Sequence, residues 1–91
     1  MMLKVVTTKQ FEKDFALVKK RGKKMEKLKE VLNFLVARDV LPPKYKDHLL
    51  VGNYINHREC HIEPDWLLLY KVDSEEEKLY LTRTGSHSDL F

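Results

Sequence analysis

Residues 66–72 read Trp66-Leu67-Leu68-Leu69-Tyr70-Lys71-Val72, a nearly continuous apolar run in a chain of 91 residues. Such a run, with little alternation, is typical of a central strand that is covered on both faces or nearly so. The charged residues 74–77 follow as a turn, and residues 78–84 alternate well enough to pair back as a hairpin. The sequence therefore predicts a sheet centred on residues 66–72.

The first residues predict a short strand followed by a helix. Residues 3–6 contain a β-branched run that fits a strand. Thr7, with Gln10 three positions later, fits a capping box, so we expect a helix to begin there. Its apolar side chains, at positions 11, 15 and 18, lie on one face until Gly22 interrupts the pattern.

A second helix is predicted over residues 23–37. Its apolar side chains, at positions 25, 28, 32 and 35, repeat with the period of an amphipathic helix that lies on an apolar surface. Pro42-Pro43 ends the helical region, because proline lacks the amide donor and restricts the residue before it. The two helices therefore form a hairpin that precedes the strands.

The order of these elements indicates the α+β class. We expect an N-terminal strand, a helical hairpin and then antiparallel strands that form a small sheet, with both helices on one face. A length of 91 residues predicts a single domain, residues 1–91, that holds together without disulfides or a structural metal. The opposite face of the sheet and its rim are then open for a ligand.

Basic residues are concentrated in the first half of the chain. Residues 1–46 contain 13 Lys/Arg against 5 Asp/Glu, whereas residues 47–91 contain 4 against 9. The basic residues around the turn of the helical hairpin include Lys19, Lys20, Arg21, Lys23, Lys24 and Lys27. Such a cluster suits a phosphate backbone or an acidic protein partner, and it equally fits a solvated helix face.

The single cysteine, Cys60, cannot form an internal disulfide, and no N-terminal apolar run is long enough for a signal peptide or membrane span. We therefore expect a cytoplasmic protein with no membrane contact. Neither Cys-x-x-Cys nor His-Glu-x-x-His occurs, and His57 and His61 stand four positions apart in a segment that looks extended rather than helical. We expect no metal or other cofactor.

Three of the four histidines, His48, His61 and His87, stand near acidic residues in the second half of the chain, and Asp65 follows His61 by four positions. An imidazole exchanges a proton near neutral pH, so several on one small domain predict acid–base chemistry. Each could instead be a loop or tail residue without a function, and Asp65 could bond to its own turn. His57 neighbours a predicted loop, and we leave it out of the site.

Arg83 stands near the end of the last predicted strand. Its guanidinium could hold a phosphate through two parallel hydrogen bonds or form a cross-strand salt bridge. Trp66 is expected either in the core or stacked on a base. Phe91, an aromatic at the end of the sequence, indicates a tail that is held in place or used.

The motifs that carry these residues are Lys46-Asp47-His48, residues 58–70 (Arg58-Glu59-Cys60-His61-Ile62-Glu63-Pro64-Asp65-Trp66-Leu67-Leu68-Leu69-Tyr70) and residues 83–91 (Arg83-Thr84-Gly85-Ser86-His87-Ser88-Asp89-Leu90-Phe91). Together they resemble the YafQ branch of the RelE/ParE superfamily of bacterial toxins. The His-x-Glu-Pro-Asp-Trp and Gly-Ser-His-x-x-Leu-Phe stretches are specific in combination, whereas the helical half is not. Leu49 departs from the pattern, because the family has a proline after the first histidine.

The resemblance implies a RelE/ParE-like fold and a small endoribonuclease that cuts messenger RNA in the ribosomal A site. A cognate antitoxin would hold it inactive, and operator DNA would be contacted only through that antitoxin. The expected catalytic residues are His48, His61, Asp65, His87 and Arg83. The expected RNA-binding residues are Trp66, Phe91, Arg58 and Lys46. The basic residues of the hairpin turn are expected to dock on ribosomal RNA.

The expected reaction is metal-independent attack of the RNA 2′-hydroxyl on the adjacent phosphorus, which leaves a cyclic phosphate or its 3′-phosphate product and a free 5′-hydroxyl. We assign one proton transfer to His87 and leave the other open between Asp65 and His48. His61 would orient a partner or donate to the phosphate, and Arg83 would stabilise its charge. Two other functions remain open: a ParE-like inhibitor that binds a DNA topoisomerase, and a non-catalytic RNA- or antitoxin-binding module.

Overall fold

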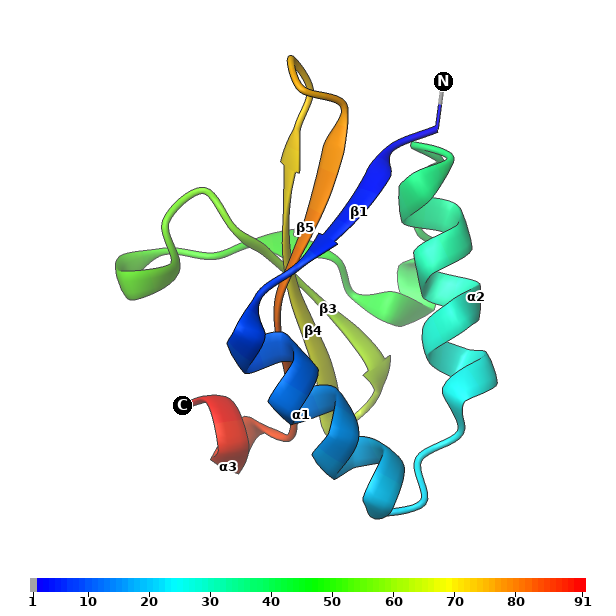
Figure 1. Cartoon of the computed structure of the whole chain (residues 1–91), viewed down its shortest axis with the longest axis vertical. Helices are drawn as coiled ribbons and strands as arrows, with labels where there is room; N and C mark the ends of the chain where they lie inside the picture. The colour runs from blue at the N-terminus through cyan, green and yellow to red at the C-terminus, as the bar shows by residue number, and fades with distance from the viewer. Residues whose placement is uncertain (1) are drawn as a thin grey trace.

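The computed structural model describes residues 2–91, except for the side chain of Asn53. In this part of the chain a five-stranded sheet has the strand order β1-β5-β4-β3-β2 (Figure 1). The strands are β1 (Lys4–Thr7), β2 (His48–Leu49), β3 (Arg58–Glu63), β4 (Trp66–Asp73) and β5 (Lys78–Gly85). β1 pairs with β5 in parallel, and the remaining pairings are antiparallel. The predicted α+β class is confirmed.

The helices are α1 (Lys9–Lys20), α2 (Met25–Val36) and α3 (His87–Leu90), with the 3-10 turns η1 (Pro43–Tyr45) and η2 (Gly52–Tyr54). The capping box predicted at Thr7 is wrong by one residue. Thr8 is the N-cap, and its hydroxyl accepts a hydrogen bond from the Phe11 amide at 2.9 Å. Thr7 still belongs to β1, where it pairs with Leu81. No helix in the described residues is both long and apolar enough to cross a membrane.

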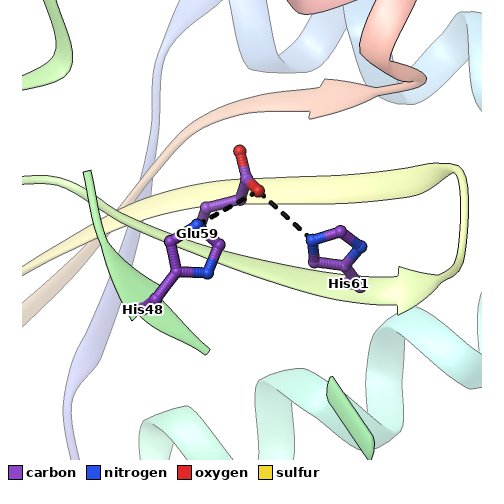
Figure 2. Close-up of side chains that lie close together, drawn as sticks. All are labelled: His48, Glu59 and His61. Carbon is purple, nitrogen blue, oxygen red and sulfur yellow. Dashed lines mark ion pairs between the residues drawn. The ribbon is translucent and has the colours of Figure 1, made fainter. Parts of the chain in front are cut away.

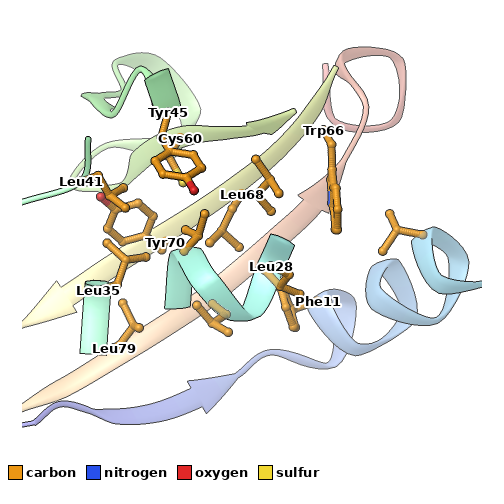
Figure 3. Close-up of a cluster of buried hydrophobic side chains, with 14 of the residues drawn as sticks. Phe11, Leu28, Leu35, Leu41, Tyr45, Cys60, Trp66, Leu68, Tyr70 and Leu79 are labelled. Carbon is orange, nitrogen blue, oxygen red and sulfur yellow. The ribbon is translucent and has the colours of Figure 1, made fainter. Parts of the chain in front are cut away.

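One face of the sheet and the two long helices enclose the main core. Phe11 of α1 and Leu28 of α2 meet Trp66 and Leu68 of β4 there, as Figure 3 shows. The shared core confirms that both helices of the hairpin lie on one face. The first five residues of β4 are at most 2% exposed, as predicted for a strand covered on both faces.

The opposite face of the sheet holds a second, smaller core. Leu67 and Leu69 of β4 pack there against Leu90 of α3, with Leu50 and Tyr54 lying over them. The expectation of a wholly open face is therefore wrong, because α3 and the segment around η2 cover its middle. The histidines lie beside this cover, on the same face.

Candidate active site

Strand register brings two of the predicted histidines onto one carboxylate. His48 of β2 lies opposite Glu59 of β3, and His61 stands two residues further along β3, where a strand places it on the same face. Oε1 of Glu59 lies 3.4 Å from Nε2 of His48 and 3.3 Å from Nε2 of His61 (Figure 2). Sequence reasoning missed Glu59, whose side chain is only 7% exposed. We call these three residues the Glu59 cluster.

The other ring nitrogen of each histidine faces a backbone carbonyl. Nδ1 of His48 lies 2.8 Å from the Lys46 oxygen, and Nδ1 of His61 lies 3.4 Å from the Pro64 oxygen. A carbonyl can only accept, so these bonds need a proton on Nδ1. Nε2 of each ring lies within ion-pair distance of Glu59, so the carboxylate would stabilise a ring that carries a second proton there.

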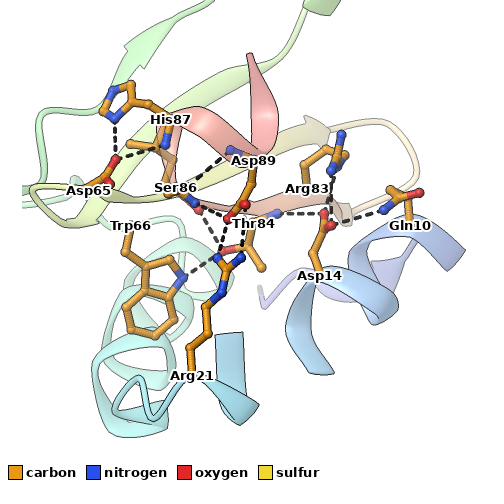
Figure 4. Close-up of polar contacts among 11 residues, drawn as sticks. Gln10, Asp14, Arg21, Asp65, Trp66, Arg83, Thr84, Ser86, His87 and Asp89 are labelled. Atoms are coloured by element: carbon orange, nitrogen blue, oxygen red, sulfur yellow. Dashed lines mark hydrogen bonds and ion pairs between the residues drawn. The ribbon is translucent and has the colours of Figure 1, made fainter. Parts of the chain in front are cut away.

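His87 is bound differently, by an exposed carboxylate. Oδ1 of Asp65 accepts from the backbone amide of His87 at 2.9 Å and lies 2.7 Å from its Nδ1 (Figure 4). These bonds, the amide bond first, lower the pKa of the Asp65 carboxyl. An anionic Asp65 is a poor general acid, but it orients the imidazole and leaves Nε2 of His87 free. We call these two residues the Asp65 pair.

The three rings form one row. Ring centroids are 6.2 Å apart for His48 and His61 and 5.7 Å apart for His61 and His87. The prediction that these distant segments converge is confirmed. His57 bonds elsewhere, through Nε2 to the Thr82 hydroxyl at 3.0 Å.

The helix that carries His87 is fixed at its start. Ser86 caps α3, and Asp89 returns the bond by accepting from the Ser86 amide at 2.9 Å. A Cβ on Gly85 would lie 2.9 Å from a carboxylate oxygen of Asp89, so the close approach needs glycine. Nη1 of Arg21 reaches the same carboxylate at 2.6 Å, and this bond, the largest cause, lowers the pKa of Asp89. Arg21, one of the residues expected to dock on RNA, is therefore paired with Asp89 and anchors α3.

Two of the lysines expected to dock on RNA are also engaged. Lys23 and Lys27 lie 3.0 Å and 2.7 Å from the two carboxylate oxygens of Glu63, and the Lys27 bond, followed by that of Lys23, lowers the pKa of Glu63. Within the residues that the structure describes, three of the lysines expected to dock form no salt bridge and are exposed: Lys19, Lys20 and Lys24. The surface available for docking is therefore smaller than the sequence indicated.

Arg83 is bound by a carboxylate of α1 that sequence reasoning did not single out. Its Nε and Nη2 donate to the two oxygens of Asp14 at 2.8 Å and 3.1 Å. Burial acts to raise the pKa of Asp14, but hydrogen bonds from Arg83, Gln10 and the Thr84 amide lower it overall. The salt bridge considered for Arg83 exists, though to a helix rather than across strands. Two of its donors are thus unavailable to a phosphate.

Arg58 likewise has an internal partner. Its Nε donates to Oδ2 of Asp47 at 3.1 Å, its Nη2 lies 3.0 Å from the same oxygen, and the Tyr70 hydroxyl also donates to Asp47. These bonds hold the residue that precedes His48. Arg58, expected to bind RNA, thus has an internal partner while its side chain remains 41% exposed.

The two residues expected to stack on bases, Trp66 and Phe91, differ in their exposure to solvent. Trp66 is 0% exposed, and its Nε1 donates to the Thr84 hydroxyl at 2.9 Å. The base-stacking role expected for Trp66 is wrong, because its ring faces are packed in the core. Phe91 is 65% exposed and meets Tyr54 edge-on at 6.0 Å between ring centroids, so it retains a free face.

The Glu59 cluster also has the composition of a metal site. The facing nitrogens of His48 and His61 and an oxygen of Glu59 all lie within 4.8 Å of one another. Two imidazoles and a carboxylate suit zinc or copper, and the carbonyls on Nδ1 would support the rings as outer partners. This set was not predicted from the sequence, where the spacing of His57 and His61 and two absent motifs indicated no metal. Cys60 is unsuited, because burial, the largest cause, raises its pKa to about 12.

Comparisons with known proteins agree with these motifs. The model of the family described as bacterial toxin of type II toxin-antitoxin system, YafQ, matches residues 3–91. The mRNA interferase toxin YafQ of Escherichia coli K12 is 43% identical over 83 residues, which cover 90% of this chain and 88% of that protein.

Solved structures show the same likeness. The crystal structure of a metal-bound toxin from Helicobacter pylori has a TM-score of 0.94 at 44% identity, covering 99% of this chain and 100% of that one. The E. coli DinJ-YafQ toxin-antitoxin complex gives 0.90 at 39% identity, covering 100% and 99%. The chain belongs to the YafQ family of bacterial toxins of type II toxin-antitoxin systems.

Proposed function

We propose that this toxin is an mRNA interferase, an endoribonuclease that cleaves messenger RNA on the ribosome without a metal ion. The E. coli relative bears that name. The observation that carries the proposal is the row of three imidazoles, in which His61 lies 5.7 Å from His87. A ParE-like inhibitor or a simple binding module has no use for such a row.

In the proposed reaction Asp65 supports the histidine that accepts a proton, and Glu59 supports the histidines that donate one. Nε2 of His87, free because Asp65 holds Nδ1, takes the proton of the 2′-hydroxyl. As the bond from the 2′-oxygen to phosphorus forms, the bond from phosphorus to the 5′-oxygen breaks. The leaving 5′-oxygen receives a proton from the Glu59 cluster, in which the His61 ring lies 5.7 Å from the His87 ring. The products are a 2′,3′-cyclic phosphate and a 5′-hydroxyl.

Two further residues serve the substrate in this proposal. Arg83 keeps its charge beside Asp14, which raises its pKa, and it stabilises the phosphate through its field more than through a clamp. Phe91 offers its exposed ring to an unstacked base. Both roles suit single-stranded RNA.

The partners follow from charge and from the relatives. The E. coli relative is seen in complex with DinJ, and we expect a cognate antitoxin for this chain, with operator DNA bound only through it. Lys19, Lys20 and Lys24, exposed around the hairpin turn, would dock on ribosomal RNA.

The test is primer extension on a defined messenger RNA with and without programmed ribosomes. New 5′ ends that appear only with ribosomes support the proposal. Intact RNA in both arms would contradict it, and inhibition of DNA supercoiling by the same preparation would favour the ParE-like function.

A second observation concerns metal. The H. pylori relative is described as metal-bound, and the Glu59 cluster of this chain fits a metal ion. A metal ion there would occupy the imidazole nitrogens that proton transfer requires.

We therefore expect EDTA to leave cleavage unchanged and added Zn²⁺ to inhibit it about tenfold or more. Calorimetry should show that His48→Ala weakens Zn²⁺ binding; loss of activity in EDTA would contradict the metal-independent reaction.

A further inference from the structure

A cleft of about 390 Å³ opens beside the row of histidines. It lies between the first half of α2, the turn η1 and the end of β3, and its lining includes Lys27, Lys44, Lys46, His61 and Glu63. We call it the lysine cleft. Its volume lies at the lower end of the roughly 300–1,000 Å³ range of small-ligand sites, which suits one nucleotide and not a duplex.

The lysine cleft shares two residues with the active-site surroundings. His61 lines it and also faces Glu59 at 3.3 Å. Lys46 lines it and provides the carbonyl, 2.8 Å away, that bonds to Nδ1 of His48. A group that binds in the cleft therefore lies directly beside the phosphate on which the histidines act.

The charge of the cleft favours an anion. Three lysines and two glutamates line it; Glu63 is bound by Lys23 and Lys27, and Glu30 forms no salt bridge among the described residues, so the lining keeps a net positive charge. Lys44 and Lys46 are exposed and have no salt-bridge partner among the described residues. The Lys44 ammonium lies 5.0 Å from the Tyr45 ring, which holds it at the cleft.

We infer that the lysine cleft binds the phosphate and sugar of the nucleotide next to the scissile bond, with Lys44 and Lys46 on its phosphate. This inference rests on the proposed ribonuclease function, because the occupant is the continuation of the same RNA strand. It explains why two unpaired cations lie beside the catalytic histidines and not only on the hairpin.

The test compares dinucleotides that carry a 2′-O-methyl group at the scissile position, with or without a terminal 5′- or 3′-phosphate. The methyl group blocks attack, so binding can be measured on the parent protein. We expect one terminal phosphate to raise affinity about tenfold, and its position reports which side of the scissile bond the cleft accepts. Lys44→Gln/Lys46→Gln should abolish that gain and reduce the slope of log affinity against log salt by about 0.7.

The matched control is Lys9→Gln/Lys13→Gln, which removes the same charge from exposed positions of α1. It should keep the gain from the terminal phosphate. Equal affinity of all dinucleotides for the parent, or loss of the gain in the control as well, would overturn the inference. A double variant that keeps the gain but loses the antitoxin would assign the cleft to a protein partner instead.

Cleavage of translated messenger RNA is scored separately. If the parent protein cleaves RNA on the ribosome but binds dinucleotides equally with and without a terminal phosphate, the inference about the cleft is contradicted. The proposed ribonuclease function is then unaffected. A parent protein that does not cleave translated messenger RNA would contradict the proposed function itself.

Discussion

Asp65 and Glu59 each bind imidazole, but the Asp65 side chain is 66% exposed whereas that of Glu59 is 7% exposed. Asp65 bonds to one ring and leaves its second nitrogen free. Glu59 faces two rings whose remaining nitrogens are already directed at carbonyls. In the proposed reaction the same functional group therefore supports a proton acceptor in one place and a proton donor in the other, because the burial and the number of partners differ.

The largest difference between the two carboxylates should appear on removing their charge. Glu59→Gln keeps the shape but removes the negative charge that faces both imidazoles, so kcat should fall about 100-fold. Asp65→Asn should cost about tenfold, because an exposed carboxylate is screened by water. Single-turnover cleavage on programmed ribosomes measures both.

The control for these variants is Glu75→Gln, which changes an exposed carboxylate in the turn between β4 and β5 that has no salt bridge among the described residues. Circular dichroism should show that all three proteins are folded. An Asp65→Asn defect equal to or larger than that of Glu59→Gln would show that burial does not separate the two roles.

The two aromatic residues of the site sharpen the comparison between its exposed and buried parts. Phe91→Ala should lower cleavage about tenfold through lost base stacking and leave the melting temperature nearly unchanged. Trp66→Phe should keep cleavage within about threefold but lower the free energy of unfolding by about 1–3 kcal/mol, through the lost bond to Thr84 and a small cavity. If activity assays and thermal melts instead showed that Trp66→Phe loses cleavage and Phe91→Ala loses stability, the result would indicate that Trp66 contacts RNA.

The smallest expected effect is on the pH dependence of stability, through the Arg21–Asp89 pair that anchors α3. The folded-state pKa of Asp89 is depressed by Arg21, so the stabilising bond is fully present above the unfolded-state pKa of about 4 and is lost as pH falls below it. Between about pH 5 and pH 3 the parent should therefore lose a few degrees of melting temperature more than Asp89→Asn does. Asp39→Asn, whose carboxylate has no salt bridge in the described part of the chain, is the control, and equal pH dependence of parent and Asp89→Asn would contradict the anchor.

Local patterns predicted the elements well. The apolar run from Trp66 to Tyr70 identified the central strand, and the period of residues 25–35 identified α2. The parallel pairing of β1 with β5 was not predictable in the same way, because it joins segments more than 70 positions apart. The helix α3 had a readable signal, since Ser86 and Asp89 stand at capping-box spacing.

The site was predicted in part for the same reason. Histidine chemistry marked His48, His61 and His87, but their pairing with carboxylates depends on register. Glu59 is buried because β2 and β4 flank it, which a single sequence does not reveal. Arg21 and Arg83 are likewise bound by carboxylates distant along the chain, and such ion pairs partly neutralise the basic surface that charge patterning predicts.

The most direct test of the account is primer extension on a translated messenger RNA with three proteins: the parent, His87→Ala and His57→Ala. His87 faces the row of imidazoles with a free Nε2, whereas His57 bonds to Thr82 outside it. The account predicts equal cleavage by the parent and His57→Ala, and a loss of about 100-fold to 10,000-fold for a folded His87→Ala. A folded His87→Ala that cleaves at the parental rate would contradict it.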